Sequence, residues 1–377
     1  MVSLEERFAM GYCVRPKVVI SHWSLVIGIN NKDKRQVTKD KFMNYKMKWT
    51  IAGMVGAIAS IGCSLSASAM SFTEWCTNSN FNSPARHTVE KLLEIAGTED
   101  CAAAETELSA MTDLNLSAKE ISNIEPLAAL THLERLDLSI NQITDIAPLS
   151  SLTQLKQLYL SKNKITDVSP LSDLNLIKLN LDGNELVDVA PIAKIETLKD
   201  LSLRENQIVD LSPLTALNSL STLFVDGNQI TDLQPLTAFD TLSGADLSNN
   251  QIADLRPLGT MKQLEWIALS NNQIEDITPL KELTGLVELD LSGNQITDVS
   301  PIANLTNMSE LFLNNNQIED VTPLASLTDL TALFLSGNKI TDISPLASLP
   351  RLSRLLVTDN AIADRTCPFE PQRICQF

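Results

Sequence analysis

Eleven asparagines recur at an almost constant spacing through the middle and C-terminal parts of this chain of 377 residues. Nine of the ten intervals between them are 22 residues long, and the remaining interval is 21. A fixed period of this length indicates a solenoid, in which each repeat packs against its neighbours. The asparagines are Asn141, Asn163, Asn184, Asn206, Asn228, Asn250, Asn272, Asn294, Asn316, Asn338 and Asn360.

One repeat, which begins at Leu286, reads LVELDLSGNQITDVSPIANLTN. Leu289 and Leu291 alternate with acidic residues, which predicts a short strand with one buried face. Such a strand is too short to be stable alone, so it must pair in parallel with its equivalents in neighbouring repeats. The side-chain amide of Asn294, placed after the strand, can satisfy backbone groups of adjacent turns that burial would otherwise leave unpaired.

Two further columns of residues mark the second half of each repeat. Pro301 recurs in almost every unit and is suited to open a short helical turn. Asp298, three residues earlier, recurs with it and can accept a backbone N–H just ahead of that turn. Each repeat is therefore predicted to consist of a strand, a loop and a short helical turn.

The repeated pattern LxxLxLxxNxITDIxPLxxLT, which runs from about Met111 to Ile362, resembles the leucine-rich repeat family and its bacterial internalin-type 22-residue class. The resemblance implies an α/β solenoid that curves in the right-handed sense. It places a parallel sheet on the concave face and short helical turns on the convex face. It also implies that partner proteins bind to the sheet face.

A secretory signal peptide is predicted over residues 43–69. Lys46 and Lys48 form its basic segment, an apolar stretch follows, and small residues precede a cleavage site after Ala69. Because a signal peptide belongs at the N-terminus, residues 1–42 are interpreted as a mis-called or disordered extension.

Translation is therefore expected to begin at Met43 or Met47. Two alternatives remain open for this segment, a membrane anchor and a lipid-modified Cys63. The apolar run contains several Gly and Ser residues and is short for a membrane span. No stable membrane insertion is expected after cleavage.

The remainder of the chain divides into a helical N-terminal cap over residues 70–110, about twelve repeat strands over 111–364, and a C-terminal cap over 365–377. Caps are expected because a terminal repeat would otherwise expose the edge of the core. In the N-terminal cap, Gly97 is predicted to end one helix and Thr98 to cap a second.

Four cysteines lie outside the predicted signal peptide and extension, two in each cap, and they allow three pairings. A stack of twelve strands separates the two ends by about 50 Å, whereas a disulfide needs Cα atoms within about 7 Å. The expected disulfides are therefore Cys76–Cys101 and Cys367–Cys375. Zinc binding is the weaker alternative because no CxxC motif is present, and the predicted disulfides favour export.

The chain is acidic, with a formal net charge of −17, and residues 1–69 are a basic part of it. An acidic protein of this kind is not expected to bind nucleic acid or an anionic membrane. The recurring Asp column lacks the glycine-rich pattern of calcium-binding repeats, so neither a metal nor another cofactor is expected. His87 and His132 are isolated, and the sequence carries no phosphate loop, GxSxG or HExxH motif. The chain is therefore not expected to be an enzyme.

Candidate binding residues are the large or charged side chains on the predicted concave face, where most neighbours are small or polar. One interpretation is a binding hot spot. The alternative for Phe312 and Phe334 is stacking between strands that needs no ligand. Trp266 is predicted to be more isolated, which favours a role in binding there. The candidates are Tyr159, Phe224, Trp266, Glu288, Glu310, Phe312, Phe334 and Leu356.

The sequence as a whole favours an exported, monomeric, non-catalytic solenoid that binds a protein of unknown identity through its concave face. Secretion or a periplasmic or cell-envelope location is expected. Because the sequence ends at Phe377 without a cell-wall sorting signal, a soluble binder is favoured over an anchored adhesin. Two alternatives remain open, namely binding of carbohydrate or another envelope polymer, and an intracellular scaffold similar to phosphatase-binding leucine-rich repeat proteins.

Overall fold

The computed structural model describes residues 70–78, 80, 83–370 and 374–377. The predicted extension, residues 1–42, and the predicted signal peptide, residues 43–69, lie outside the described residues. Among the described helices, none combines the length and apolar character needed to cross a membrane.

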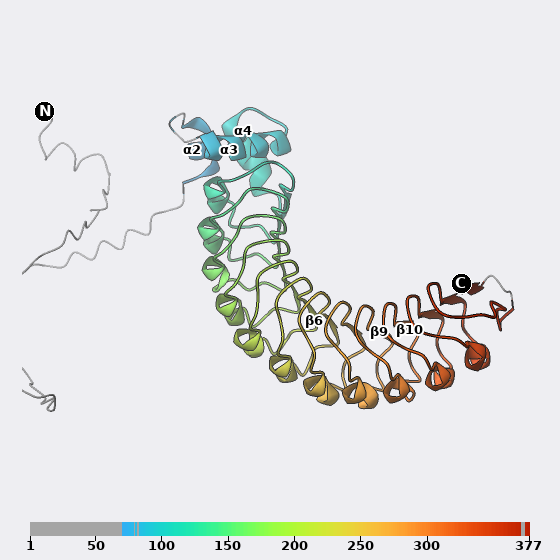
Figure 1. Cartoon of the computed structure of the whole chain (residues 1–377). Coiled ribbons are helices and arrows are strands. Elements are labelled where there is room, and N and C mark those ends of the chain that lie inside the picture. Colours follow the sequence, from blue (N-terminus) through green and yellow to red (C-terminus); the bar gives the residue numbers. More distant parts are fainter. Residues whose placement is uncertain (1–69, 79, 81–82, 371–373) are drawn as a thin grey trace, which may run out of the picture. The chain divides into compact units, whose positions relative to one another are not determined.

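The described part of the chain is a solenoid whose strands form one parallel sheet in chain order, as the repeat predicts. Strands line the inner, concave side of the curve, and short 3-10 turns line its outer side (Figure 1). The strands are β1 Asp113–Asn115, β2 Arg135–Asp137, β3 Gln157–Tyr159, β4 Lys178–Asn180, β5 Asp200–Ser202, β6 Thr222–Phe224, β7 Gly244–Asp246, β8 Trp266–Ala268, β9 Glu288–Asp290, β10 Glu310–Phe312, β11 Ala332–Phe334, β12 Arg354–Leu356 and β13 Cys375–Gln376.

The expected helical turns are 3-10 turns of three to five residues, and each has a proline at its start. They are η1 Glu125–Ala129, η2 Ala147–Ser151, η3 Ser169–Leu171, η4 Ala190–Lys194, η5 Ser212–Ala216, η6 Gln234–Ala238, η7 Arg256–Thr260, η8 Thr278–Glu282, η9 Ser300–Ile302, η10 Thr322–Ser326 and η11 Ser344–Ser348.

Three helices cover the N-terminal end of the sheet: α2 Phe72–Thr77, α3 Ser83–Ala96 and α4 Cys101–Ser109. Phe72, fully buried, contributes to the same core as the repeats, and α2 and α3 lie against η1. A disulfide joins Cys76 in α2 to Cys101 at the start of α4. The N-terminal apolar edge of the repeats is therefore covered by helices.

The prediction that Thr98 caps the second helix is wrong. The N-cap of α4 is Asp100, whose Oδ1 accepts the N–H groups of Ala102 at 3.0 Å and Ala103 at 2.8 Å. Thr98 Oγ1 instead accepts the N–H of Asp100 at 3.1 Å. Threonine and aspartate are both good N-cap residues, but in this structure the Asp100 carboxylate is the group that contacts the free N–H groups of the first turn of α4.

A single apolar core runs through all the repeats. In the unit that begins at Leu286, the side chains of Leu289, Leu291 and Ile296 are fully buried, and those on the helical side are no more than 1% exposed. The alternation predicted for the strand is observed, because Leu289 faces the core while Glu288 is exposed. No repeat could bury these residues alone, so stability comes from stacking.

The recurring asparagine connects each repeat to the one before it. Asn294 Nδ2 donates to Leu269 O and Leu291 O, both at 3.0 Å, and Asn294 Oδ1 accepts the N–H of Ile274 at 3.0 Å. The other internal asparagines make the same contacts and are 9% exposed or less. These bonds satisfy the backbone where the chain leaves the sheet and no strand partner is available.

The aspartate column supports the turn that follows. Asp298 Oδ1 accepts the N–H of Ser300 at 2.8 Å, just ahead of Pro301. The residue at the helical N-cap is Val299, which has no side-chain cap, so the aspartate acts one residue earlier as an Asx turn. In the same position, hydrogen bonds from Ser169 hold the pKa of Asp167 below its ordinary value.

The C-terminal end of the sheet is completed by a strand outside the repeat. The Cys367–Cys375 disulfide ties β13 to the segment that follows the last repeat, and β13 pairs in parallel with β12 at Leu355 and Leu356. Loop-entropy estimates give about 3.5 kcal/mol for the Cys76–Cys101 bond and about 2.5 kcal/mol for the shorter Cys367–Cys375 loop. The disulfide and β13 together protect the edge where a solenoid would fray first.

The asparagine contacts predict a large and position-dependent effect of substitution. Asn294→Ala should lower the free energy of unfolding by roughly 2 to 4 kcal/mol, because several buried backbone groups lose their partners. Chemical denaturation followed by circular dichroism measures the change. Asn307→Ala is the control: this exposed asparagine bonds only Thr284 O at 2.9 Å and should cost under about 1 kcal/mol. Equal losses in both variants would contradict this role for the buried asparagine.

Candidate functional site

The parallel register places the outward side chains of the concave face in rows that cross the strands. Trp266, Glu288 and Glu310 occupy the first strand position of β8, β9 and β10 and lie in register. Phe312, Phe334 and Leu356 occupy the third position of β10, β11 and β12. Side chains from different repeats therefore lie within contact distance although they are 22 residues apart in sequence.

Phe312 and Phe334 stack on one another. Their ring centroids are 4.4 Å apart, with 5° between the ring planes. The guanidinium of Arg354 lies 5.0 Å from the centre of the Phe334 ring. Phe334 is consequently only 8% exposed, so this binding candidate offers little surface to a partner. Stacking between strands accounts for the position of these two rings without a ligand.

Trp266 is not isolated, contrary to the prediction. Its ring centroid lies 5.6 Å from that of Phe224, with 33° between the planes. The two residues lie on β8 and β6, and Gly244 on β7 stands between them. A Cβ on Gly244 would overlap the indole, so the ring lies over the glycine backbone. A glycine within a strand, which often marks a close approach, was the sequence signal for this pair.

Tyr159 lies apart from the other aromatic residues, between two cations. Arg135 and Lys178 lie 5.1 Å and 5.9 Å from the centre of its ring, and its hydroxyl donates to Gln157 Oε1 at 3.1 Å. Both faces of the ring therefore meet groups of the protein itself.

An ionic cluster, which sequence reasoning missed, borders Phe224. Arg204 Nε lies 3.0 Å from Asp226 Oδ1, and Arg204 Nη2 lies 3.3 Å from Asp246 Oδ2. Asp182 Oδ1 accepts the N–H of Arg204 at 2.9 Å, and the guanidinium lies 4.4 Å from the centre of the Phe224 ring. Asp182, Arg204 and Phe224 border a hollow of about 390 Å³ on the concave face.

The signal for this cluster was present in the repeat. The residue three places after the buried central residue of each strand is serine in most units, as at Ser270 and Ser292. In three successive units it is Asp182, Arg204 and Asp226. A run of charges in a column that is otherwise uncharged and mostly serine indicates a group whose members contact one another across the repeats.

Two carboxylates, Asp226 and Asp246, share one guanidinium in this cluster. The pKa of Asp226 is raised to about 6, first because the carboxyl group is largely buried and then because Asp246 is close; Arg204 acts in the opposite direction. Asp226 Oδ1 lies within ion-pair distance of Arg204 but accepts no well-formed hydrogen bond. The cluster is therefore incompletely satisfied at neutral pH.

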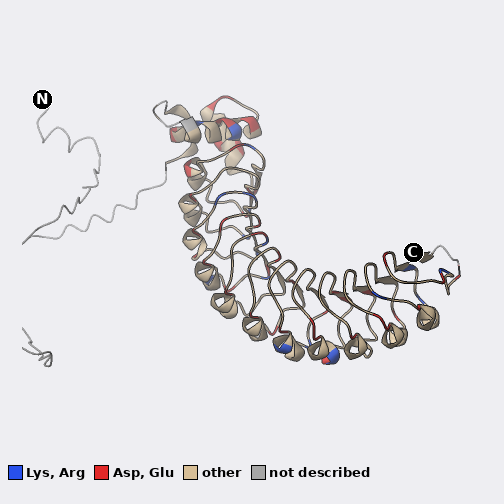
Figure 2. Ribbon diagram, viewed as in Figure 1, with Lys and Arg blue, Asp and Glu red and all other residues tan. Residues whose placement is uncertain are grey.

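Acidic residues occur along the solenoid and on its N-terminal helices (Figure 2). Glu288 and Glu310 form an exposed pair on the concave face, next to Trp266. Partial burial, followed by the charges of Glu310 and Asp290, raises the pKa of Glu288 above its ordinary value. None of the salt bridges within the described residues includes Glu288, Glu310 or Asp290.

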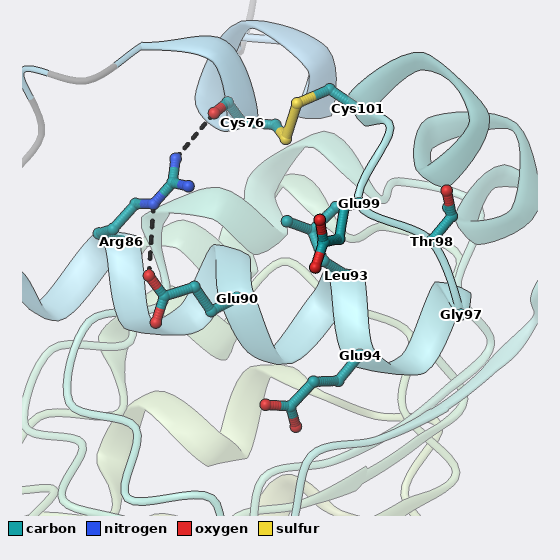
Figure 3. A pocket seen from close by; sticks show the side chains of 9 residues that line it. All are labelled: Cys76, Arg86, Glu90, Leu93, Glu94, Gly97, Thr98, Glu99 and Cys101. Carbon is teal, nitrogen blue, oxygen red and sulfur yellow. Dashed lines mark hydrogen bonds and ion pairs between the residues drawn. A yellow bond between two sulfur atoms is a disulfide. The ribbon is translucent and has the colours of Figure 1, made fainter.

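A hollow of about 720 Å³ lies among the N-terminal helices (Figure 3). Its basic residue is already engaged: Arg86 Nη1 donates to Cys76 O at 2.8 Å, and Arg86 Nε lies 3.5 Å from Glu90 Oε1. Both histidines of this region bond to backbone carbonyls, His87 to Lys119 O and His132 to Leu108 O. These contacts fasten the helices to the first repeats. Across the described ranges, no three His, Cys, Asp or Glu side chains converge as metal ligands would.

Comparison with known proteins gives both a family and a fold. A family model described as "Leucine Rich repeats (2 copies)" matches residues 131–173, 196–238, 241–282 and 284–326. The structure of an internalin, InlF, from Listeria monocytogenes is similar, with 30% identity and a TM-score of 0.67. That match covers 77% of this chain and 94% of the internalin. A search of curated proteins finds no match.

Two further structures share the fold. The functional domain of InlJ from Listeria monocytogenes, which includes a cysteine ladder, has 25% identity and a TM-score of 0.52, over 68% of this chain and 65% of that one. A plant peptide hormone receptor, RGFR1, in complex with RGF2 has 22% identity and a TM-score of 0.57. The second match covers 67% of this chain and 45% of the receptor, and it shows likeness of fold alone.

The ionic cluster predicts an unusual titration. Asp226 should titrate near pH 6, as followed by the carboxyl carbon signal in NMR spectra. Arg204→Gln should raise this pKa further by removing the opposing charge, and Asp246→Asn should lower it. Because the folded protein takes up this proton near pH 6 and the unfolded chain only near 3.8, this group favours folding as the pH falls from 7 to 4. Titration of Asp226 at or below 3.8 would refute this account.

The contact between Gly244 and Trp266 predicts how a methyl group added at residue 244 changes the stability and the tryptophan emission of the protein. Gly244→Ala should displace the indole from Phe224 and cost about 1 to 3 kcal/mol, although alanine suits a strand better than glycine. The emission of Trp266, taken as the difference from the Trp266→Phe variant, should shift to longer wavelength as the ring gains solvent. Thr222→Ala, on the neighbouring strand, is the control and should leave the emission unchanged. An unchanged spectrum in Gly244→Ala would contradict the packing described here.

Proposed function

This chain belongs to the leucine-rich repeat family, in its internalin-like class, and on that premise we propose that it is an exported, non-catalytic protein that binds another protein through its concave face. The observation that carries this proposal is the Phe224–Trp266 pair beside the exposed Glu288 and Glu310. A partly exposed tryptophan with a charged rim is the composition typical of a protein-binding hot spot.

The two disulfides support export, because such bonds persist in oxidising compartments. The segment at residues 43–69, outside the described residues, has the sequence layout of a signal peptide. Both features favour secretion, or a periplasmic or envelope location, over the intracellular scaffold. The acidic charge of −17 disfavours nucleic acid and anionic membranes as partners.

Protein is favoured over carbohydrate because sugar rings require an accessible aromatic face. Phe224 lies between Arg204 and Trp266, and Phe334 is covered by Phe312 and Arg354. The neighbouring receptor RGFR1 is seen in complex with RGF2, and this precedent of fold favours a polypeptide ligand.

A capture experiment tests this proposal. The immobilised protein should retain a specific protein from the culture medium or envelope extract of its own organism. The variant Trp266→Ala/Phe312→Ala should retain at least about tenfold less, because aromatic anchors dominate interface energetics. A glycan array, run in parallel, tests the carbohydrate alternative.

The control is Val187→Ala/Val209→Ala, which removes two apolar side chains that are 62% and 52% exposed and lie outside the strands of the concave face. Thermal unfolding of each variant establishes that the fold is retained. Capture of the same proteins by wild type and by the Trp266/Phe312 variant would show that the concave face is not the binding surface. Glycan binding that depends on Trp266 would favour the carbohydrate alternative.

A further inference from the structure

On the concave face, two neighbouring strands carry acidic side chains that form no salt bridge within the described residues. Glu288 and Glu310 lie in register on β9 and β10, on strands that run about 4.8 Å apart in a sheet. Asp290 projects from the third position of β9, so three acidic side chains belong to two neighbouring strands. Like charges directly opposite one another destabilise a sheet.

Three other carboxylates of the concave face lie close to a cation. Asp113 lies 3.7 Å from Arg135, and Asp226 and Asp246 share Arg204. For Glu288 and Glu310 no such partner occurs among the described residues, where all seven salt bridges lie elsewhere. The next basic residue of the row, Arg354, lies over the Phe334 ring.

The charge pair adjoins an aromatic residue that is held in place. Trp266 lies in register with Glu288 and is fixed by Phe224 and by the glycine backbone beneath its ring. Its side chain is partly exposed, and Ala268, the outward residue two positions later, is small. An indole face attracts a cation, and it also packs against the methylene chain of a basic residue. The tryptophan therefore suits the methylene chain of a basic side chain, and the carboxylates suit its charged end.

We propose that the surface formed by Trp266, Glu288 and Glu310 receives a lysine or arginine side chain from a segment of the protein partner. This inference rests on the proposed function and specifies the chemistry of the partner. The aliphatic stem lies along the indole, and the charged group lies between the two carboxylates. Charge complementarity favours a basic side chain here, because a bound cation offsets the repulsion between Glu288 and Glu310 in the unbound protein.

Partial burial strengthens the argument. The pKa of Glu288 is raised by its burial and by its acidic neighbours, so its charged form is disfavoured in the unbound protein. A cation at this position would offset both effects and lower the pKa of Glu288 towards its ordinary value. An uncharged apolar segment would instead increase the desolvation of the two carboxylates, which costs free energy.

Selection from a random library of 12-residue peptides displayed on phage tests the inference without knowledge of the natural partner. The library is panned in parallel on the wild-type protein, on Glu288→Gln/Glu310→Gln and on Glu275→Gln/Glu319→Gln, with a chelator present to exclude metal bridging. The last variant is the charge-matched control: it removes the same charge from two exposed glutamates that lie outside the strands, in the repeats of β8 and β10.

Lysine or arginine should be enriched among binders of the wild type and of the control, and this enrichment should be absent from Glu288→Gln/Glu310→Gln. The strongest binder, made as a synthetic peptide, should bind Glu288→Gln/Glu310→Gln about tenfold more weakly than wild type. Replacing the basic residue of the peptide with glutamine should weaken its affinity for the wild-type protein about tenfold. The same replacement should change its affinity for Glu288→Gln/Glu310→Gln little. This double-mutant cycle assigns the loss to the contact itself.

Three outcomes would overturn the inference. Basic enrichment that persists on Glu288→Gln/Glu310→Gln would place the contact elsewhere. Failure to enrich any peptide on the wild type would show that the surface does not take a linear basic segment. Binders that depend on Trp266 but carry no basic residue would refute the inference while leaving the concave-face function intact. Thermal unfolding should show no loss of stability in Glu288→Gln/Glu310→Gln, because the substitution relieves repulsion.

Discussion

The structure depends on the hydrogen bonds that each buried asparagine makes between neighbouring repeats. Where the chain leaves the sheet, backbone N–H and C=O groups have no strand partner, and burial without a partner would be costly. A single asparagine amide has both donors and an acceptor, and at Asn294 it bonds Leu269 O, Leu291 O and the N–H of Ile274. The leucines can then form a continuous core, because the polar backbone beside them is satisfied.

This arrangement determines which positions of the repeat can vary in residue type. Positions that face the core or carry the turn are held to one residue type by packing, capping or hydrogen bonding. The outward strand positions are free of these demands, and the in-register sheet turns them into rows of contacting side chains. Besides Tyr159 with its two cations, the departures from small or polar residues produce three groups. They are the ionic cluster at Arg204, the Phe224–Trp266 pair with its glutamates, and the Phe312–Phe334 stack. We consider the second group the centre of the binding surface, since the first and third satisfy much of their own interaction potential.

The two ends of the solenoid differ from the repeats, because the first and last units of a stack would otherwise expose the apolar core. At the N-terminus, helices α2 to α4 bury the exposed side of the first repeat and are tied by Cys76–Cys101. At the C-terminus, a short strand pairs with β12 and is held by Cys367–Cys375. Both ends thus combine coverage of the core with a covalent bond, in a protein whose units are individually unstable.

The sequence alone determined the architecture, because the 22-residue period combines the strand alternation, the asparagine and the turn signal in every unit. It also aligned Trp266 with Glu288 and Glu310, since equal repeat lengths fix the register. The sequence did not reveal which side chains touch. Three features depend instead on the direction in which each side chain points and on the space around it. They are the contact of Trp266 with Phe224 across Gly244, the near-complete burial of Phe334, and the sharing of Arg204 by two aspartates. The strand β13 and the cap Asp100 likewise required the tertiary structure, because both lie outside the repeat, where no periodicity constrains the chain.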